Sequence, residues 1–473
     1  MSDTSRTEIP VDLTFAARVP RPWVEELYPD DAKQPPPGLL QTSAADLPTD
    51  DIDVERYFSY EWHRREVDQV WKKTWQVACR VEELAKPGDY VVYDIVDDSV
   101  LVVRTHANRL KAYTNSCMHR ATTLADGAGC VEQFRCPFHG WSYDLDGKLT
   151  FVPGSWDFSH LDLDAIELPS VQVDVWGGFV FINLDPQCGP LKDYLGVLPE
   201  HLDAFGIDER YKAVHVSKVI PCNWKVAQEA FIEGYHVAET HYDKNADGSL
   251  AATGAATTNY DTSIQYDHWQ PHVTRMNMLG GIPSGYIAHH LPDEQSIVDA
   301  YFGRRRAEPP TLKPGQTARA LIADHNRAVW GKRHGLDFSE ASDAEMIDQI
   351  QYTLFPNFTV WPTVVAPLIY RFRPYEDDPN RCIYEVWMLY PKAADGSHPD
   401  PMAEIRLRDD QPWSDVPELG NYGPVIDQDT PNFPRIQKGL RASAKGAVSL
   451  GNYQESRIRA FHQTLERYLA EDI

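Results

Sequence analysis

The apolar residues of this chain recur in patterns that predict several kinds of element. Between residues 54 and 80, tryptophans and valines follow helical spacing, which predicts a helix. From residue 88 to 116, apolar and polar residues alternate, and this alternation predicts antiparallel strands. The run WGGFVFINLDP at 176–186 predicts a buried strand that ends at a proline. Helical spacing returns at 223–241, and strands are predicted again within 352–391.

These patterns predict three parts. Residues 1–54 are polar and rich in proline, so we expect an N-terminal arm. Residues 55–186 predict a small all-β domain with a flanking helix, and residues 187–473 predict a larger domain in which helices flank an antiparallel sheet. The expected fold class is therefore α+β.

Composition and charge narrow the classes of partner. The 473 residues carry a formal net charge of −25, which disfavours nucleic acid or an anionic membrane surface as a partner. No run approaches the roughly 18–20 apolar residues of a membrane helix. The start, MSDTSRTEIP, lacks the features of a signal peptide, and seven scattered cysteines fit a reducing compartment. We expect a cytoplasmic protein whose thiols are free or bound to metal.

Two Cys/His pairs lie close together in the predicted β domain. Cys117 and His119 form a Cys-x-His pair, and Cys136 and His139 form a Cys-x-x-His pair. In a two-iron cluster, mixed pairs allow both thiolates to bind one iron and both imidazoles the other, which is the Rieske arrangement. A Cys₂His₂ zinc site is the alternative. Cys130 lies in the gap without a neighbouring histidine and is the only plausible substitute ligand.

With the flanking run Cys-Pro-Phe-His-Gly-Trp, the chain from about residue 55 resembles the α subunit of a Rieske non-haem iron oxygenase, an aromatic-ring-hydroxylating oxygenase. The resemblance implies a Rieske [2Fe-2S] domain over 55–186 and a mononuclear iron catalytic domain over 187–473. It also implies two cofactors, a Rieske cluster and one mononuclear Fe(II).

The run NWKVAQEAFIEGYHVAETH at 223–241 matches the motif of that catalytic domain and supplies two imidazoles, His236 and His241. An open iron site of the 2-His-1-carboxylate type needs both to face one ion. Five residues correspond to about 140° around an ideal α-helix, so the rings cannot converge from an undistorted helix. We therefore expect the helix to widen or end between Tyr235 and His241.

The resemblance assigns roles to distant carboxylates. Asp429, some eight residues before the run Gln-Lys-Gly-Leu, is the expected third iron ligand, with Asp427 as the alternative. Glu233 stands where resembling enzymes usually carry an aspartate that links the iron site to a cluster histidine of the neighbouring subunit. This chain has glutamate there, as a subset of the family does. On a helix, Glu233 and His236 would share one face, and Glu233 could orient that ligand.

The implied function is a terminal oxygenase that uses O₂ and electrons from NAD(P)H, delivered by a separate reductase or ferredoxin. A homotrimer (α3) is implied, with or without a small β subunit (α3β3). Flexible methionines at Met276 and Met278, with Asn357, suggest a pocket for a hydrophobic substrate that is aromatic, polycyclic or steroid-like. A quaternary amine or methyl group is the second substrate class. A non-catalytic Rieske electron carrier or a zinc-stabilised binding protein is the alternative of another class.

Overall fold

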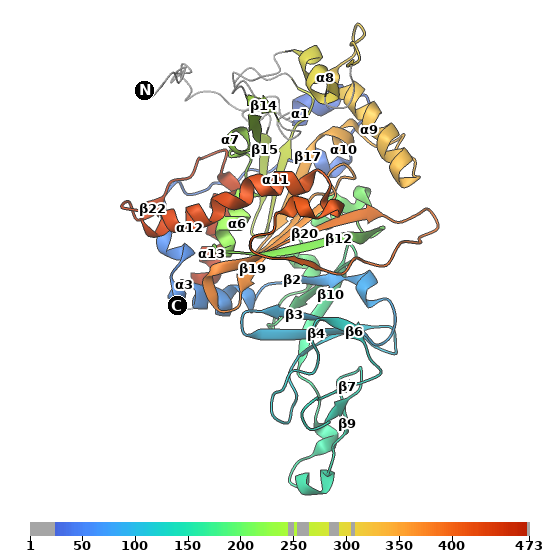
Figure 1. Cartoon of the computed structure of the whole chain (residues 1–473), viewed down its shortest axis with the longest axis vertical. Coiled ribbons are helices and arrows are strands. Elements are labelled where there is room, and N and C mark those ends of the chain that lie inside the picture. The colour runs from blue at the N-terminus through green and yellow to red at the C-terminus, as the bar shows by residue number, and fades with distance from the viewer. Residues whose placement is uncertain (1–23, 245–249, 253–263, 283–292, 304–307, 471–473) are drawn as a thin grey trace. The chain divides into compact units, whose positions relative to one another are not determined.

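The computed structural model describes residues 24–244, 250–252, 264–282, 293–303 and 308–470 (Figure 1). The chain divides into two compact units. The first comprises Met1–Thr42, Gly234–Tyr266 and Met276–Ile350, and the second comprises Ser43–Glu233, Asp267–Arg275 and Gln351–Ile473. The division into three parts at residues 54 and 186 stays a prediction.

The small β domain is built from a seven-stranded antiparallel sheet and a three-stranded one. The larger sheet has the order β2-β11-β10-β5-β4-β3-β6. Its strands are β2 (Gln76–Arg80), β3 (Asp89–Ile95), β4 (Asp98–Arg104), β5 (Leu110–Thr114), β6 (Ala128–Cys130), β10 (Ser170–Trp176) and β11 (Phe179–Asn183). The smaller sheet comprises β7 (Phe134–Arg135), β8 (Ser142–Tyr143) and β9 (Leu149–Phe151). This confirms the predicted strands at 88–116 and 176–186.

A separate, eight-stranded sheet has the strand order β15-β16-β17-β18-β19-β20-β12-β21. They are β12 (Arg210–Ile220), β15 (Ile264–Trp269), β16 (Val273–Met278), β17 (Gln349–Leu354), β18 (Phe358–Val360), β19 (Leu368–Tyr375), β20 (Asp378–Pro391) and β21 (Ile405–Leu407). β12 pairs antiparallel with β20 and parallel with β21. The strands predicted within 352–391 are confirmed.

Helix α6 (Trp224–Ala230) packs on β19 and β20. The Asn223 side chain accepts the backbone N–H of Lys225 and so caps its start. Trp224, Ala227 and Gln228 recur at helical spacing and are buried. Three further helices complete this part of the fold, α11 (Tyr422–Asp429), α12 (Phe433–Arg441) and α13 (Ser456–Ala470). Together with the sheets, these helices confirm the α+β class.

The described residues of the first unit form both helices and strands. Its helices are α1 (Val24–Leu27), α2 (Pro37–Leu40), α7 (Val237–Thr240), α8 (Glu294–Gly303), α9 (Ala318–His334) and α10 (Asp343–Ile347). The Thr317 side chain accepts the backbone N–H of Ala320 at the start of α9, and Gly335 ends that helix with φ of +66°. Ile297, Val298 and Ile322 belong to the apolar core between α8 and α9.

The fold also contains several short strands and helices. Strand β1 (Ile52–Asp53) pairs with β22 (Ala447–Val448). The others are α4 (Leu191–Tyr194), α5 (Leu198–Leu202), β13 (Tyr242–Lys244) and β14 (Leu250–Ala252).

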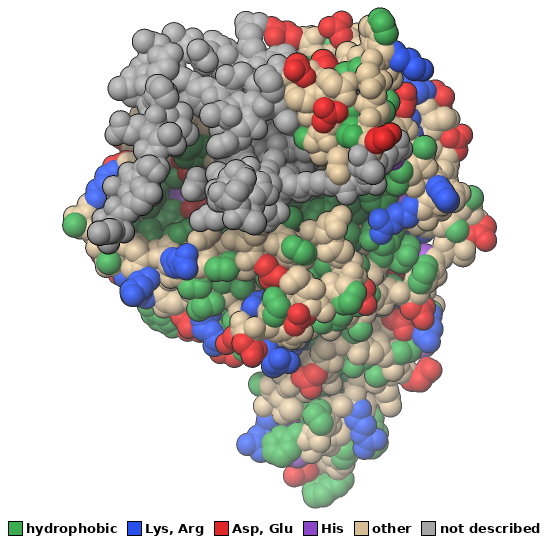
Figure 2. Space-filling view, turned by 45° about the horizontal axis from the view of Figure 1, so that its top comes forward, with side chains coloured by type: hydrophobic (Ala, Val, Ile, Leu, Met, Phe, Trp, Pro, Cys, Tyr) green, Lys and Arg blue, Asp and Glu red, His purple; other side chains and the backbone are tan. Residues whose placement is uncertain are grey.

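Lys and Arg side chains are scattered among Asp and Glu on the face drawn in Figure 2. No helix within the described residues is long and apolar enough to cross a membrane.

The single helix predicted over 54–80 is wrong. A 3₁₀ turn at Val54–Tyr57 leads into α3 (Tyr60–Glu66), a π-helical turn covers Val67–Trp71, and β2 follows at Gln76–Arg80. All five β2 residues are buried, so they lack the alternation that marks a strand with one wet face. Periodicity alone does not separate such a strand from a buried helical segment.

Candidate metal centres

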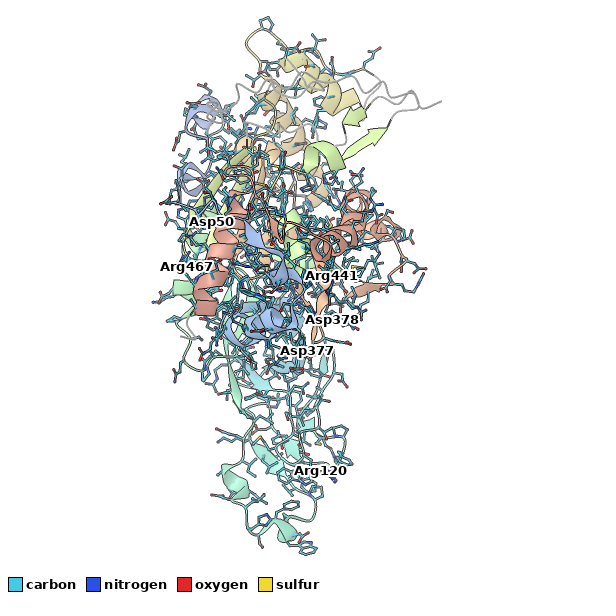
Figure 3. All side chains as sticks on the ribbon, turned by 90° about the vertical axis from the view of Figure 1, so that its left-hand side faces the viewer. Asp50, Arg120, Asp377, Asp378, Arg441 and Arg467 are labelled. Atoms are coloured by element: carbon cyan, nitrogen blue, oxygen red, sulfur yellow. The ribbon has the colours of Figure 1, made fainter. Side chains whose placement is uncertain are left out.

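The two Cys/His pairs meet at two neighbouring loops of the small β domain. Cys117 and Cys136 are each 3% exposed, and their thiols are hydrogen-bonding neighbours. The rings of His119 and His139 have centroids 4.6 Å apart at an interplanar angle of 72°. The structure therefore brings all four predicted ligands together. Arg120, labelled in Figure 3, follows His119 in the sequence. The Arg120 guanidinium lies 5.3 Å from the ring centroid of exposed Phe138.

Each loop turns tightly at a residue with left-handed backbone. Ala121 has φ of +60° and donates its N–H to the Cys117 carbonyl at 2.9 Å. Gly140 has φ of +76° and donates to the Cys136 carbonyl at 3.0 Å. A Cβ at Gly140 would also lie 3.1 Å from Arg135 Nη2. These turns place each cysteine and its histidine on the same small loop, and only glycine adopts the second turn without strain.

The electrostatics of the loops fit an iron–sulfur cluster. Burial alone would raise the pKa of Cys136. The pKa is lowered instead, because backbone N–H groups of Phe138 and His139 point at its sulfur. Burial raises the pKa of Cys117, although Tyr143 Oη and the His119 backbone oppose it. Among the described residues, the buried His119 Nδ1 has no hydrogen-bond partner. A Cys136 thiolate stabilised by backbone amides and an imidazole nitrogen free to ligate fit a Rieske donor set.

Two aromatic rings hold His119 in place. Its ring stacks on Trp141 with centroids 5.0 Å apart and an interplanar angle of 7°, and Phe158 meets it edge-on at 5.6 Å. Cys130 lies elsewhere, exposed on β6 with its Sγ 3.9 Å from the Pro87 carbonyl. Its position gives no support to Cys130 as a substitute ligand.

The segment 223–241 breaks earlier than predicted. Helix α6 ends at Ala230 rather than beyond Tyr235, and α7 begins at Val237. Gly234 lies in the break, where a Cβ would stand 2.7 Å from Ile264 Cδ1 and where the N–H donates to Tyr266 Oη at 3.3 Å. Glycine lets the chain between α6 and α7 pack closely against these side chains.

His236 and His241 flank the short helix α7, one residue before it and one residue after it. Their ring centroids lie 5.4 Å apart at 68°. Asp429 is the last residue of α11 and is 3% exposed. One ligand atom from each of His236, His241 and Asp429 lies within 4.8 Å of the other two. Two imidazoles and one carboxylate at this spacing form a donor set that suits non-haem iron.

Asp427 has a different role. One carboxylate oxygen accepts the Trp413 N–H at 2.7 Å, and the other accepts the Ser414 N–H at 3.0 Å. Both oxygens of Asp427 therefore hold a 3₁₀ turn (Trp413–Asp415), whereas the Asp429 carboxylate lies with the two histidines.

A second His/Glu group also has its ligand atoms within 4.8 Å of one another, but ion pairs explain it. It consists of His215, Glu385 and Glu404. Arg371 donates to Glu385 Oε1 at 2.7 Å, and Arg373 donates to Glu385 Oε2 at 3.1 Å. Burial would raise the pKa of Glu385, but these arginines hold it well below the usual range. A carboxylate neutralised by two guanidinium groups is a structural ion pair rather than a metal ligand, and sequence gave no signal for this network.

Glu233 is 8% exposed and lies between α6 and α7. The expectation that Glu233 and His236 share a helix face is therefore wrong, because neither residue is helical. The pKa of nearby Glu455 is raised, first by its burial and further by the negative charge of Glu233. Glu233 thus lies in a partly desolvated, carboxylate-rich environment.

The three predicted pocket residues are all buried. Met276 and Met278, on β16, are 2% and 4% exposed, and Asn357 is 2% exposed. Among the described residues, the Asn357 side-chain nitrogen has no hydrogen-bond partner.

Two family models match this chain. Residues 202–471 match the catalytic domain of the ring hydroxylating alpha subunits, and residues 74–161 match the Rieske [2Fe-2S] domain. The chain therefore belongs to the ring hydroxylating alpha subunits, the Rieske non-haem iron oxygenase family that the sequence resembles. This confirms the expected fold class and the expected cofactors, a Rieske cluster and a mononuclear iron.

The proteins similar to this chain include a monooxygenase subunit and a dioxygenase subunit. The chain is 32% identical over 193 residues to the carnitine monooxygenase oxygenase subunit of Escherichia coli K12, covering 40% of this chain and 52% of that protein. It is 32% identical over 196 residues to the chlorobenzene dioxygenase subunit alpha of Cupriavidus sp. PS12, covering 40% and 43%. The chain thus spans about half the length of the curated relatives it matches.

A solved structure of a quaternary ammonium Rieske monooxygenase superposes with a TM-score of 0.62 at 18% identity. The superposition covers 90% of this chain and 100% of the chain of the monooxygenase. At this identity the likeness concerns the fold.

Proposed function

We propose that this protein is the terminal oxygenase component of a Rieske oxygenase system. It uses O₂ and electrons from NAD(P)H, which a separate reductase or ferredoxin delivers, to hydroxylate a hydrophobic small molecule. The observation that carries this proposal is the pair of complete donor sets in one chain. When bound, the cluster supplies one-electron transfer and the mononuclear iron supplies oxygen-activating chemistry.

Cys117, His119, Cys136 and His139 would hold the cluster, and His236, His241 and Asp429 would hold the mononuclear iron. The amides that point at Cys136 and the aromatic rings around His119 orient the first set. The Gly234 contacts and the end of α11 orient the second. These contacts therefore orient the Cys136 thiol, the His119 ring and the segments that carry the other set.

Glu233 is proposed as the link in electron transfer between subunits. In a homotrimer (α3, or α3β3 with a small β subunit), its carboxylate would accept from His236 of its own chain and from the cluster histidine, His139, of the neighbour. Its burial supports this role, because a desolvated carboxylate binds imidazole N–H groups more strongly than an exposed one.

Two substrate classes have specific support. An aromatic, polycyclic or steroid-like substrate fits the buried, flexible thioethers of Met276 and Met278, with Asn357 as a polar anchor. The chlorobenzene dioxygenase relative supports that class. A quaternary amine or a methyl group is the second candidate, because relatives are a carnitine monooxygenase and a choline monooxygenase.

Iron and acid-labile sulfide analysis with EPR of the dithionite-reduced protein tests the proposal. Three irons and two sulfides per chain with a Rieske signal are expected. A non-catalytic electron carrier would show a Rieske signal and two irons even after Fe(II) is added. A zinc-stabilised binding protein would show zinc and no cluster signal. Turnover with a surrogate reductase on naphthalene, on a steroid and on carnitine would then separate the substrate classes.

A further inference from the structure

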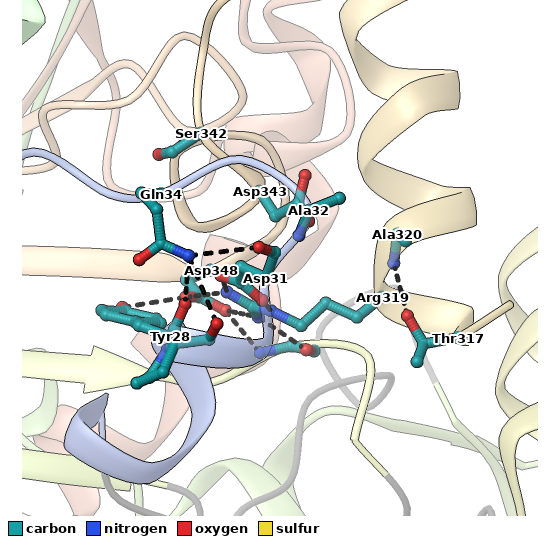
Figure 4. Close-up of polar contacts among 12 residues, drawn as sticks. Tyr28, Asp31, Ala32, Gln34, Thr317, Arg319, Ala320, Ser342, Asp343 and Asp348 are labelled. Carbon is teal, nitrogen blue, oxygen red and sulfur yellow. Dashed lines mark hydrogen bonds and ion pairs between the residues drawn. The ribbon is translucent and has the colours of Figure 1, made fainter. Parts of the chain in front are cut away.

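A buried arginine joins the N-terminal segment to Asp348 and to the turn after β16 (Figure 4). Arg319, on α9, is 4% exposed. Its guanidinium donates to both Asp31 oxygens at 2.6 and 2.9 Å and to both Asp348 oxygens at 2.6 and 2.9 Å. It also donates to the Gly280 carbonyl at 2.9 Å. This planar fork holds three segments of the first unit together.

Tyr28 extends the same network to β16. Its hydroxyl donates to Asp348 Oδ2 at 3.0 Å and accepts the Asn277 side-chain N–H at 2.5 Å. The Gly280 N–H donates to Asp348 Oδ1 at 2.7 Å. We call Tyr28, Asp31, Arg319 and Asp348 the Arg319 clamp. The clamp therefore fixes both Asn277 in β16 and the turn that follows the strand.

The turn after β16 is shaped for this contact. A Cβ at Gly281, where φ is +73°, would lie 2.8 Å from the Arg319 Cα. A Cβ at Gly280 would lie 2.7 Å from the Ile347 carbonyl oxygen. Because glycine alone allows this approach, the turn packs closely against α9 and against Ile347 at the end of α10.

The opposite face of β16 reaches the segment with the predicted iron ligands. Side chains alternate along a strand, so Met276 and Met278 project away from the face that holds Asn277. Met278 Sδ lies 3.6 Å from the position that a Gly234 Cβ would take. Gly234 is two residues before His236. A shift of β16 would therefore move the surface against which the His236 segment packs.

We propose that Arg319 is a positioning residue that holds β16, and through Met278 the Gly234–His236 segment, in the geometry that binds iron. The inference rests on the proposed function in so far as His236 is an iron ligand. The clamp buries two carboxylates against one guanidinium, and burial raises the pKa of Asp31 although the hydrogen bonds and the charge of Arg319 oppose this rise. Buried groups of this kind have no good alternative partner, so the clamp holds one arrangement.

Three full-length variants with cluster and iron loaded test the proposal. Arg319→Lys keeps the charge but cannot form the two-sided fork. Tyr28→Phe removes only the hydroxyl that joins Asn277 to Asp348. Lys33→Gln is the matched control, since Lys33 lies on the same segment in an exposed 3.5 Å pair with Glu340.

Two readouts are compared with wild type. The first is the rate at which ferrozine removes the mononuclear Fe(II), with the Rieske EPR signal as the internal standard. The second is hydrogen exchange at residues 273–281, with β4 as the internal reference. We expect Fe(II) release about tenfold faster in Arg319→Lys, the low end of the effect of removing groups that orient metal ligands. Exchange should also rise at 273–281, and both changes should be smaller in Tyr28→Phe and absent in Lys33→Gln.

Wild-type release and exchange rates in folded Arg319→Lys and Tyr28→Phe would overturn the proposal. If Arg319→Lys does not fold, Tyr28→Phe decides: faster exchange at 273–281 supports the clamp, and unchanged exchange refutes it. A wild-type protein that holds no mononuclear iron would refute the proposed function instead, and hydrogen exchange would still test the clamp.

Discussion

Tyr143 Oη lies 3.4 Å from Cys117 Sγ and accepts the backbone N–H of Met118 at 3.0 Å. The Met118 amide occupies an oxygen lone pair and leaves the hydroxyl proton to point at the sulfur. A thiolate that ligates iron has no proton to donate, so Tyr143 is the donor in the loaded protein. Hydrogen bonds to cluster sulfurs are one of the means by which a protein sets a Rieske potential.

Tyr143→Phe should lower the reduction potential of the cluster. The hydrogen bond stabilises the reduced cluster more than the oxidised one, because reduction adds negative charge to the sulfurs. Loss of about 1 kcal/mol of this preference corresponds to a fall of roughly 40 mV for a one-electron couple. Redox titration followed by EPR measures the change.

Tyr113→Phe is the matched control for Tyr143→Phe. Tyr113 is buried in the same core, but its hydroxyl donates to the Leu145 carbonyl at 3.4 Å rather than to a sulfur. An equal fall in both variants would show that general loss of packing, not the bond to Cys117, sets the potential.

Asp429→Ala should empty the mononuclear site and leave the Rieske EPR signal unchanged. The carboxylate supplies the only charged ligand of the proposed set, so we expect at least a 10–100-fold loss of iron affinity. Asp427→Ala should retain iron but lower the thermal midpoint, because the Trp413 and Ser414 amides lose their acceptor. Iron analysis after dialysis separates the two, and loss of iron in Asp427→Ala alone would exchange their roles.

The sequence predicted the parts of each site that depend on local chemistry. The spacing of Cys117, His119, Cys136 and His139 survives folding because each pair occupies one small loop. Helical spacing did not predict that α6 ends at Ala230, and the chain between α6 and α7 packs against Ile264, which is distant in sequence. The Arg319 clamp and the Glu385 ion pairs also had no local signature, since their partners come from separate elements.

As the pH falls from 7.5 to 5.0, the free energy of unfolding should decrease more in wild type than in His201→Gln. Burial, with a contribution from the positive charge of Arg275, lowers the pKa of His201 from 6.5 to about 4. The folded state therefore keeps this imidazole neutral. Its contribution is fully present above pH 6.5 and is lost as the pH falls from 6.5 towards 4, up to about 3 kcal/mol.

Thermal midpoints at pH 7.5 and 5.0 test the prediction for His201. The drop between these two pH values should be smaller in His201→Gln than in wild type, while exposed His160→Gln should match wild type. Equal drops in wild type and His201→Gln would mean that His201 does not take up a proton on unfolding.

Glu233→Gln should retain both metal centres but slow electron transfer from the cluster to the iron. The amide has nearly the same shape as the carboxylate but carries no charge, so it holds an imidazole N–H more weakly. Stopped-flow absorbance of the reduced cluster after mixing with O₂ and substrate measures the step, and we expect a fall of about 10²-fold or more, corresponding to ~3 kcal/mol. Glu455→Gln is the control, because it removes a neighbouring carboxyl that has no role in the proposed link. Wild-type rates in Glu233→Gln would exclude Glu233 from the route, and an equal fall in Glu455→Gln would trace the effect to the shared carboxylate environment.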